Sequence, residues 1–531
     1  MFTQFRKKHG LINRRNLLVF TAALIAILVV SPLAWLVLRT FEVDGDRLVE
    51  LLLLNSTLTV FINSIWLVLG VTGLSLLLGV PLAYLTVRTN LPYRRFWTVA
   101  LALPLGIPSY VGAFAFTSAF GPRGRLQDIL AGFGIESLPS VYGYPGALLV
   151  MTLYTYPYVY ITSRAALKTL DLDLVDAARS LNHSRRSAFK EVTLPHILPA
   201  ASAGTLLVAL YTLSDFGTPA IMHFNTFTRM IYSEYNSFGR GYASFLSIIL
   251  LAITVFILYL ESRVRRGRTS MDGGASNGRR EVDLGGWLIP SLGLCAAVVG
   301  LALVVPVLIF GSLWLMGTPE YADALAFKPV YAFNSFYVSV AAAAAAVVLA
   351  VPVAYVSSRY PGKLTSLIER ATYVGYATPG IVLGLALVFL GITYTRPLYQ
   401  TIPLLIFAYV VRFLPQAVGS SRASILQVNR NLEEAGRTLG KTGSETFRHV
   451  TLPLISPGVA AGGILVFLTT LKELPATLVL APPGFTTLVT HIWRVQDQGY
   501  YGFAAVPALL LMLISGVSVL FIMSRENADV K

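Results

Sequence analysis

The chain has 531 residues, of which 55% are hydrophobic and 13% are charged. This composition excludes an ordinary soluble protein, whose surface needs about twice that share of charged residues. The net charge of +15 would suit a nucleic-acid partner, but the basic residues lie in short segments between long apolar runs, so we expect no nucleic acid among the partners. The single cysteine, Cys295, excludes an intrachain disulfide and a cysteine-based metal site.

Apolar runs of about 20 residues recur along the whole chain, which is typical of membrane-spanning helices. They predict an all-α membrane protein with twelve transmembrane helices in contact with the lipid bilayer. The first run is long and ends without a small-residue cleavage site, so we expect it to stay as a span and not to be removed as a signal peptide. The predicted spans are 17–38, 59–87, 97–120, 145–166, 198–222, 243–261, 287–316, 333–357, 371–391, 398–420, 458–481 and 501–523.

If the N-terminus lies inside and the spans alternate in direction, most of the 41 Lys and Arg residues fall in cytoplasmic segments. This distribution satisfies the positive-inside rule and predicts that both termini are cytoplasmic. The loops after the first and seventh spans would then lie outside. They carry the acidic residues Glu42, Asp44, Asp46, Glu50, Glu320 and Asp323.

The chain repeats itself on either side of 262–286, a basic segment rich in Gly and Ser that predicts a flexible cytoplasmic linker. Asn-Ser and Val-Pro-x-Ala-Tyr motifs in 63–85 recur in 334–356, at an offset of 271 residues. Residues 163–195 resemble residues 421–453, at an offset of 258.

These repeats predict two halves of six spans each, in 1–261 and 287–531. Both halves cross the membrane in the same direction, so they form a parallel repeat about an axis along the membrane normal. Two equivalent long loops then lie on the cytoplasmic side.

The second of these loops contains "GRTLGKT" (436–442), which is one residue short of the phosphate-binding P-loop pattern. A P-loop follows a strand, whereas the residues before this stretch look helical, with Asn431 as the expected N-cap and Glu434 three residues further on. The corresponding residues of the first loop are Asp173 and Asp176, and no Gly-Lys-Thr follows them. We therefore expect no nucleotide site and no catalysis in this chain.

Both loops instead predict a helix, a turn and a second helix. Gly440 suits a left-handed turn residue, and its counterpart Asn182 is the next most tolerant residue type in that conformation. Pro195 and Pro453 are expected to end the second helix of each loop. Two matched copies on one side of the membrane favour docking surfaces over ordinary connections.

The paired loops resemble a motif of the permease subunits of binding-protein-dependent ABC importers, E-A-A-x-x-x-G followed by x9-I-x-L-P. The departures are Asp for Glu and Asn for Gly in the first copy, Gly for the second Ala in the second copy, and Val for Ile in both. The first copy consists of Asp176, Ala177, Ala178, Asn182, Val192, Leu194 and Pro195. The second consists of Glu434, Ala435, Gly436, Gly440, Val450, Leu452 and Pro453.

The resemblance implies a type I ABC importer permease fold with two homologous six-helix halves, in a bacterial plasma (inner) membrane. It implies that each loop places a short helix in a groove of an ATPase subunit. The expected partners are therefore two ATPase subunits on the cytoplasmic side and an external substrate-binding protein. ATP hydrolysis would belong to the partner chains, and the chain itself would need no cofactor.

Four segments resemble the fused permeases of ferric iron importers, which implies ferric iron as the substrate. Thiamine, phosphonate, polyamine and sulfate permeases are built similarly and stay open as alternatives. No close pair of histidines has metal-ligand spacing, so we expect no metal site in the chain. The four segments are 101–116, 210–222, 224–235 and 471–493.

Asp215 in the fifth span and Glu473 in the eleventh span match at the repeat offset of 258. Ionisable groups cost a few kcal/mol in the hydrocarbon region, so they normally face a bundle interior or water. One interpretation is that the two acids line a translocation path. Gly217, Pro219 and Pro475 favour broken helices beside them, which are common at transport sites.

The other interpretation of these acids is purely structural. Asp215 and Glu473 would then pin helices together by pairing with Arg412, Lys472 or a backbone group. The sequence leaves both interpretations open.

Two other classes of function compete with an importer permease. A secondary transporter of the major-facilitator type would also have twelve spans in two parallel halves, but it should carry proton- or sodium-linked carboxylates and lack paired loops. A membrane ATPase built on "GRTLGKT" would need a Walker B strand and a soluble domain, and the sequence offers neither.

Overall fold

The computed structural model describes residues 2–528 except 41–44, 123, 126, 128–130, 132–133, 135–138, 183, 238, 267–280 and 318–324. In this described part the chain forms helices and one isolated bridge between Thr89 and Val282. The predicted all-α fold class is confirmed. The predicted outside residues Glu42, Asp44, Glu320 and Asp323, and most of the predicted linker, lie outside the described residues.

The chain packs as two compact units, and each is described by itself. Unit 1 comprises Met1–Gly45 and Lys328–Thr490, and unit 2 comprises Asp46–Phe327 and His491–Lys531. Each unit therefore takes residues from both predicted halves. The predicted halves describe the sequence repeat, whereas the units describe packing, so the boundaries of the halves stay a prediction.

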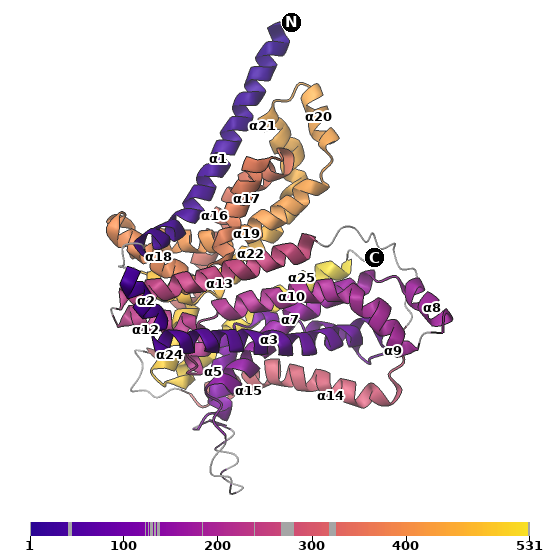
Figure 1. The fold of residues 1–531 in the computed structure, drawn as a ribbon, viewed down its shortest axis with the longest axis vertical. Coiled ribbons are helices and arrows are strands. Elements are labelled where there is room, and N and C mark those ends of the chain that lie inside the picture. Colours follow the sequence, from indigo (N-terminus) through magenta and orange to yellow (C-terminus); the bar gives the residue numbers. More distant parts are fainter. Residues whose placement is uncertain are drawn as a thin grey trace. The chain divides into compact units, whose positions relative to one another are not determined.

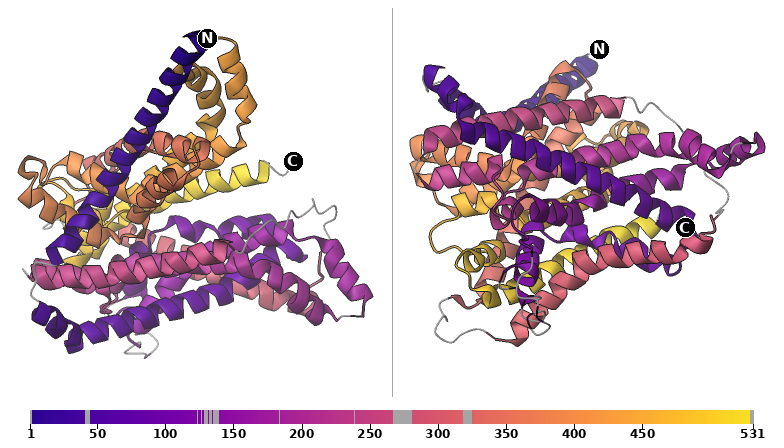
Figure 2. Two further views of the ribbon diagram at one scale, coloured as in Figure 1. Left: turned by 45° about the horizontal axis from the view of Figure 1, so that its top comes forward. Right: turned by 60° about the horizontal axis from the view of Figure 1, so that its bottom comes forward.

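Unit 2 contains the helices of the first repeat other than its first helix, which lies in unit 1. They are α2 (Gly45–Leu53), α3 (Asn55–Arg88), α4 (Arg94–Ala100), η1 (Leu103–Gly106), α5 (Ser109–Phe120), α7 (Tyr144–Thr169), α8 (Leu172–Ser180), α9 (Arg185–Ala188), η2 (Phe189–Thr193), α10 (Leu194–Ser214), α11 (Gly217–Ile221), α12 (Phe227–Asn236) and α13 (Arg240–Arg266). They are joined by later helices of the chain, which are η3 (Gly285–Trp287), α14 (Leu288–Val299), η4 (Gly300–Val304), α15 (Val305–Leu315), η8 (Tyr501–Ala504) and α25 (Ala505–Ala528). At its centre α3, α7 and α10 pack on one another pairwise, as Figure 1 and Figure 2 show.

Unit 1 repeats this arrangement with α16, α19 and α22, which also pack on one another pairwise. The sequence repeat is thus also a repeat of structure. The helices are α1 (Phe2–Thr40), α16 (Pro329–Arg359), α17 (Lys363–Ala377), α18 (Gly380–Thr393), η6 (Arg396–Leu398), α19 (Ile402–Gln427), α20 (Arg430–Thr438), α21 (Gly443–Thr446), η7 (Phe447–Thr451), α22 (Leu452–Leu471) and α23 (Pro475–Leu480). The boundary with unit 2 falls within α24 (Leu488–Asp497).

The first helix of each repeat packs on helices of the other repeat. In unit 1, α1 lies against α16, α17 and α18, and Figure 1 shows it beside α17. In unit 2, α15 of the second repeat lies against α5 of the first repeat, and also against α25 of its own repeat. This exchange explains why the compact units and the predicted halves have different boundaries.

Nine helices in the described part of the chain are long and apolar enough to cross a membrane, and up to eleven if each of two bent helix pairs is one span. The remaining predicted span, 145–166, corresponds to α7, which is 26 residues long, carries several Tyr and Thr, and is largely buried by its neighbours. The prediction of twelve spans is compatible with these helices.

Two runs that were predicted as single spans, 97–120 and 371–391, are broken helices. Each breaks within four residues, and the two parts meet at 96° in the first run and 103° in the second. Each break contains a proline, Pro108 or Pro379. Proline disfavours the helical conformation of the residue before it and so favours a break, but Pro81 and Pro352 lie inside continuous helices, so proline alone does not determine where a helix breaks.

Gly79 allows α3 and α7 to approach closely. A Cβ at this position would lie 2.8 Å from Val159 Cβ and 2.9 Å from the backbone nitrogen of Tyr160. Small residues permit such contacts between membrane helices, and a backbone atom cannot move aside as a flexible side chain can.

We expect Gly79→Leu to lower the amount of folded protein, because overpacking costs about 1–3 kcal/mol or more. Gly73→Leu is the matched control, since a Cβ at Gly73 of the same helix meets nothing within 4 Å. Size-exclusion chromatography of detergent-extracted protein measures the folded fraction of each variant. Equal folded fractions would contradict a tight contact between α3 and α7.

Candidate functional site: the paired loops and the helix breaks

Each unit carries one of the predicted loops, here named loop A (171–196) and loop B (429–454). In loop A the turn lies between α8 and α9, and in loop B it lies between α20 and α21. Both loops therefore have the helix, turn and second helix that the sequence predicts.

The first helix of each loop begins two residues earlier than predicted. The side chain of Asp171 caps α8 by accepting a hydrogen bond from the backbone nitrogen of Asp173 at 3.0 Å. The side chain of Asn429 caps α20 by accepting one from the backbone nitrogen of Asn431, also at 3.0 Å. The predicted caps Asp173 and Asn431 are wrong, because Asp171 and Asn429 are equally good cap residues and sequence spacing does not distinguish them.

The two turns are left-handed, as predicted. The φ angle is 69° at Asn182 and 87° at Gly440. A Cβ on Gly440 would meet nothing within 4 Å, so the backbone conformation alone favours glycine there. The residues just before the turns, Leu181 and Leu439, are 75% and 83% exposed. These matched exposed leucines, which the sequence analysis missed, offer apolar surface to a partner.

Most of the other motif residues also lie at the surface of the loops. Gly436 is buried, and a Cβ there would lie 3.2 Å from the side chain of Thr446, so the small residue at this position serves packing inside loop B. Asp176, Ala178 and Leu194 are half-buried, and the exposed motif residues are Ala177, Pro195, Glu434, Ala435, Leu452 and Pro453.

The prediction that Pro195 and Pro453 end the second helix of each loop is wrong. The chain continues from α9 through the π-helical turn η2 into α10, and from α21 through the π-helical turn η7 into α22. Each proline is near the start of the long helix, next to Leu194 or Leu452. Proline lacks an N–H and clashes with the carbonyl four residues earlier, and the wider π turn before it relieves that conflict.

The "GKT" stretch is the turn of loop B and not a phosphate-binding loop. It follows a helix, α20, where a P-loop would follow a strand. The hydroxyl of Thr442 and the carboxylate of Glu445 form a capping box that starts α21. Hydrogen bonds from Thr442 hold the pKa of the Glu445 carboxyl below its usual value, so the cap stays ionised near neutral pH.

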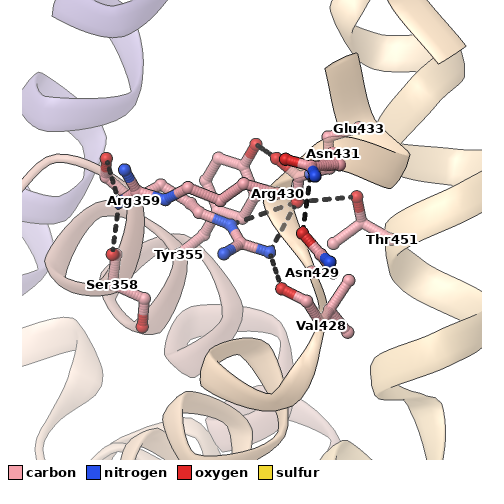
Figure 3. A network of polar contacts seen from close by, with 9 residues as sticks. All are labelled: Tyr355, Ser358, Arg359, Val428, Asn429, Arg430, Asn431, Glu433 and Thr451. Atoms are coloured by element: carbon pink, nitrogen blue, oxygen red, sulfur yellow. Dashed lines mark hydrogen bonds and ion pairs between the residues drawn. The ribbon is translucent and has the colours of Figure 1, made fainter. Parts of the chain in front are cut away.

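A buried ion pair ties loop B to the end of α16, as Figure 3 shows. Arg359 Nη2 lies 2.9 Å from Glu433 Oε1, and each side chain is 7% exposed. Glu433 also accepts hydrogen bonds from the hydroxyls of Thr451, at 3.1 Å, and Tyr355, at 3.3 Å. The sequence analysis singled out Glu434, which is exposed, and missed its buried neighbour. An arginine at the end of a span was the signal that could have indicated a buried acid nearby.

Loop A has no such ion pair, because the position equivalent to Glu433 is Val175. The arginine at the end of α3, Arg88, donates instead to two backbone carbonyls. Its Nη2 lies 2.6 Å from the oxygen of Leu167 and 3.1 Å from that of Leu170. Arg359 also donates to a backbone carbonyl, that of Val428 at 3.0 Å, so loop B differs by the ion pair that it adds.

Asp215 lies where the fifth predicted span breaks, and this predicted break is confirmed. The helix α10 ends at Ser214 and α11 begins at Gly217. Asp215 Oδ1 accepts a hydrogen bond from the backbone nitrogen of Gly217 at 3.2 Å, and its Oδ2 accepts one from the Ser109 hydroxyl at 2.8 Å. The hydroxyl of Thr228 donates to the backbone oxygen of Asp215 at 2.7 Å. These side chains satisfy polar backbone groups that the broken helix leaves open.

Glu473 lies at the equivalent break, between α22 and α23, which is also as predicted. Its Oε1 accepts hydrogen bonds from Arg412 Nη1 at 2.6 Å and from the backbone nitrogen of Ala476 at 3.2 Å. The hydroxyl of Thr477 donates to its backbone oxygen. Gly380 makes room for this pair, since a Cβ there would overlap both the guanidinium and the carboxylate.

In each unit the acid thus lies close to the residue that follows the proline of the bent helix pair, which is Ser109 after Pro108 in unit 2 and Gly380 after Pro379 in unit 1. Asp215 meets the Ser109 hydroxyl, whereas Glu473 meets a guanidinium across Gly380. These contacts are those of groups that pin helices together, and the role of the acids in a path stays a prediction. Among the described residues, no three His, Cys, Asp or Glu side chains are placed to hold a metal ion.

Two parts of the chain, residues 75–266 and 346–525, match one protein family, the binding-protein-dependent transport system inner membrane components. The chain belongs to this family. The Fe(3+)-transport system permease protein FbpB 2 of Haemophilus influenzae is 33% identical, over 92% of this chain and 94% of that protein. The ferric transport system permease protein FbpB of Actinobacillus pleuropneumoniae is 22% identical, over 90% of this chain and 72% of that protein. The sulfate transport system permease protein CysT of Salmonella typhimurium is 27% identical, over 35% of this chain and 70% of that protein.

Membership of this family confirms that the chain is an ABC-importer permease with a duplicated membrane domain. It is a multi-pass component of an inner membrane. Its relatives are transport subunits, in agreement with a chain that carries no catalysis of its own.

We expect Arg412→Met to lower the amount and thermal stability of folded permease sharply. The change removes the cation from the buried Glu473 carboxylate, and breaking such a pair costs about 3–5 kcal/mol. The double variant Arg412→Met/Glu473→Met should recover most of this loss, because no buried charge is left behind. Thermal unfolding in detergent compares the three proteins. A double variant as unstable as the single variant would contradict the ion pair as the main contribution at this break.

Proposed function

We propose that this chain is the permease subunit of an importer that moves ferric iron, which an external binding protein delivers. The observation that carries this proposal is the similarity to the Haemophilus influenzae Fe(3+) permease, which extends over 92% of the chain and so includes both loops and both helix breaks. The similarity to the sulfate permease covers 35% of the chain, which is less than one of the two predicted halves. Sulfate, thiamine, phosphonate and polyamine transport are the alternatives.

We place both termini and both loops on the cytoplasmic side of the membrane. The support is the concentration of Lys and Arg in the segments that would lie inside. Each loop then docks one ATPase subunit, so the transporter contains two. The matched short helices α8 and α20, with an exposed leucine before each left-handed turn, support docking at two places.

Gly440→Asp should weaken docking of the ATPase on loop B. The variant forces a side chain and a charge into a turn with φ of 87°, a conformation that costs a non-glycine residue about 1 kcal/mol. We expect normal insertion but loss of co-purified ATPase or of ATP hydrolysis coupled to transport. Asn182→Asp is the matched control in loop A, because that turn already holds a side chain of the same size. Full transport by Gly440→Asp would contradict the docking assignment.

We further propose that Asp215 and Glu473 line the two sides of the translocation path. Both acids lie at helix breaks, where Glu473 is buried and Asp215 is half-buried, and hard cations such as ferric iron prefer oxygen ligands. The path must release the ion, so the acids guide it by charge and form no tight site.

Asp215→Asn and Glu473→Gln should each lower iron uptake per folded transporter, since each removes a negative charge and keeps the side-chain volume. Insertion and docking of the ATPase should not change. Uptake of radiolabelled ferric iron, divided by the amount of folded permease, is the measurement. If both acids only pin helices, the variants lower the amount of folded protein and leave uptake per molecule unchanged.

Purification from the native membrane tests the proposed function as a whole. We expect the chain to bring ATPase subunits with it, and cells that lack the chain to lose uptake of ferric iron but not of sulfate or thiamine. A chain that purifies without an ATPase would contradict the proposed ATPase partners. Loss of sulfate uptake with unchanged iron uptake would overturn the choice of substrate.

A further inference from the structure

The Asn-Ser motif near the start of α3 bonds to a segment that lies far away along the chain. Asn63 Nδ2 donates a hydrogen bond to the backbone oxygen of Asn225 at 3.0 Å. The Ser64 hydroxyl accepts one from the backbone nitrogen of Phe227 at 3.1 Å. Phe227 is the first residue of α12, so the serine satisfies an N–H that the helix leaves without an internal partner.

The second copy of the motif, in α16, makes the same two bonds in the other unit. Asn334 Nδ2 donates to the backbone oxygen of Thr486 at 2.9 Å. The Ser335 hydroxyl accepts from the backbone nitrogen of Leu488 at 2.8 Å, and Leu488 is the first residue of α24. Ser64 and Ser335 are almost fully buried. Two independent copies of one geometry indicate a requirement of the fold and not a chance contact.

The other end of each long helix also bonds to the same kind of segment in both units. Arg88 donates to the backbone oxygen of Leu170, and Arg359 Nη2 donates to that of Val428 at 3.0 Å. Leu170 and Val428 are equivalent in the repeat, and each immediately precedes the residue that caps α8 or α20. Each arginine therefore holds the entry to a docking loop.

One continuous helix joins these two attachments in each unit. Ser64 is 24 residues before Arg88, and Ser335 is 24 residues before Arg359, which corresponds to roughly 36 Å at 1.5 Å per residue. Both helices continue through this length, past one internal proline each, Pro81 and Pro352, whereas their neighbours α10 and α22 stop at the helix breaks. A continuous helix transmits displacement along its axis better than a broken one, because its backbone hydrogen bonds resist bending.

We propose that α3 and α16 act as tie rods, by which we mean rigid helices that transmit movement along their axis. Each connects a docking loop to the segment at the opposite end of its unit, 222–228 or 484–490. The motif Asn63–Ser64 with Arg88, and its counterpart Asn334–Ser335 with Arg359, are then positioning residues for transport. This inference rests on the proposed function, since the force at the loops comes from the ATPase subunits. Movement of a loop pulls its arginine, the helix moves as one body, and the Asn-Ser pair moves the first turn of α12 or α24.

The test uses the complete transporter in its native membrane, with the double variants Asn63→Ala/Ser64→Ala and Asn334→Ala/Ser335→Ala. Each variant removes one tie far from the docking loops. We expect uptake of radiolabelled ferric iron per assembled transporter to fall about fivefold to tenfold, the scale of one or two lost buried hydrogen bonds. The amount of co-purified ATPase and the basal ATP hydrolysis should not change.

Thr72→Ala in α3 and Ser357→Ala in α16 are the matched controls. The hydroxyl of each bonds to carbonyls of its own helix, at Val68 and Leu69 for Thr72 and at Ala354 for Ser357. We expect both controls to keep the uptake of the parent. Controls that lose as much uptake as the tie variants would overturn the inference.

A series test separates a tie rod from ordinary packing. Arg88→Gln removes the charged contact at the loop end of the same helix. If the two ends act in series, Arg88→Gln combined with Asn63→Ala/Ser64→Ala lowers uptake per transporter no further than the more severe of the two alone. Independent losses that multiply, or losses that only follow the amount of folded protein, would overturn the tie rod. A parent that brings no ATPase with it would instead contradict the proposed function, and this inference with it.

Discussion

The fold is constrained by the cost of an unpaired backbone group in the hydrocarbon region, where no water can replace a lost hydrogen bond. Continuous helices meet this constraint mostly within themselves, and α3 and α16 are examples, each with one internal proline, Pro81 or Pro352, that lacks an N–H. Wherever a helix breaks, side chains must supply the missing partners. Asp215 and Glu473 each accept a hydrogen bond from a backbone nitrogen just after a break. The hydroxyls of Thr228 and Thr477 donate to the backbone oxygens of the same two acids. The two acids Asp215 and Glu473 therefore lie where the backbone is irregular.

The same constraint explains why the two units share one arrangement of helices and breaks although different side chains supply the hydrogen bonds. Each unit needs a partner for the acid at its break, and a hydroxyl from Ser109 or a guanidinium from Arg412 satisfies the need. Each unit also needs its proposed docking loop held in place. Arg88 does this through backbone carbonyls, and Arg359 adds the ion pair with Glu433. Loop B thus has a buried ion pair at Glu433, a position at which loop A has Val175.

The sequence predicts those features that depend on a residue type with a narrow conformational preference or on repetition. The left-handed turns at Asn182 and Gly440, the helix breaks beside Gly217 and Pro475 and the duplicated loops all belong to this group. The caps of α8 and α20 were misplaced because neighbouring residues have equal capping ability. The π turns before Pro195 and Pro453, the bends at Pro108 and Pro379, and the burial of Glu433 in place of Glu434 depend on tertiary packing, which no local pattern encodes. The exchange of α1 between the repeats has the same cause.

The central claim is that loops A and B are two equivalent docking points for ATPase subunits, and site-specific cross-linking measures it directly. A photoreactive residue is placed at Leu181, at Leu439 or at Leu315, which are 75%, 83% and 82% exposed. Leu315 ends α15, away from both loops in the chain, and serves as the control. The account predicts that irradiation of native membranes links an ATPase subunit to the chain from Leu181 and from Leu439, and not from Leu315. A cross-link to an ATPase from neither leucine of the loops, with the chain folded and active in transport, would contradict the account.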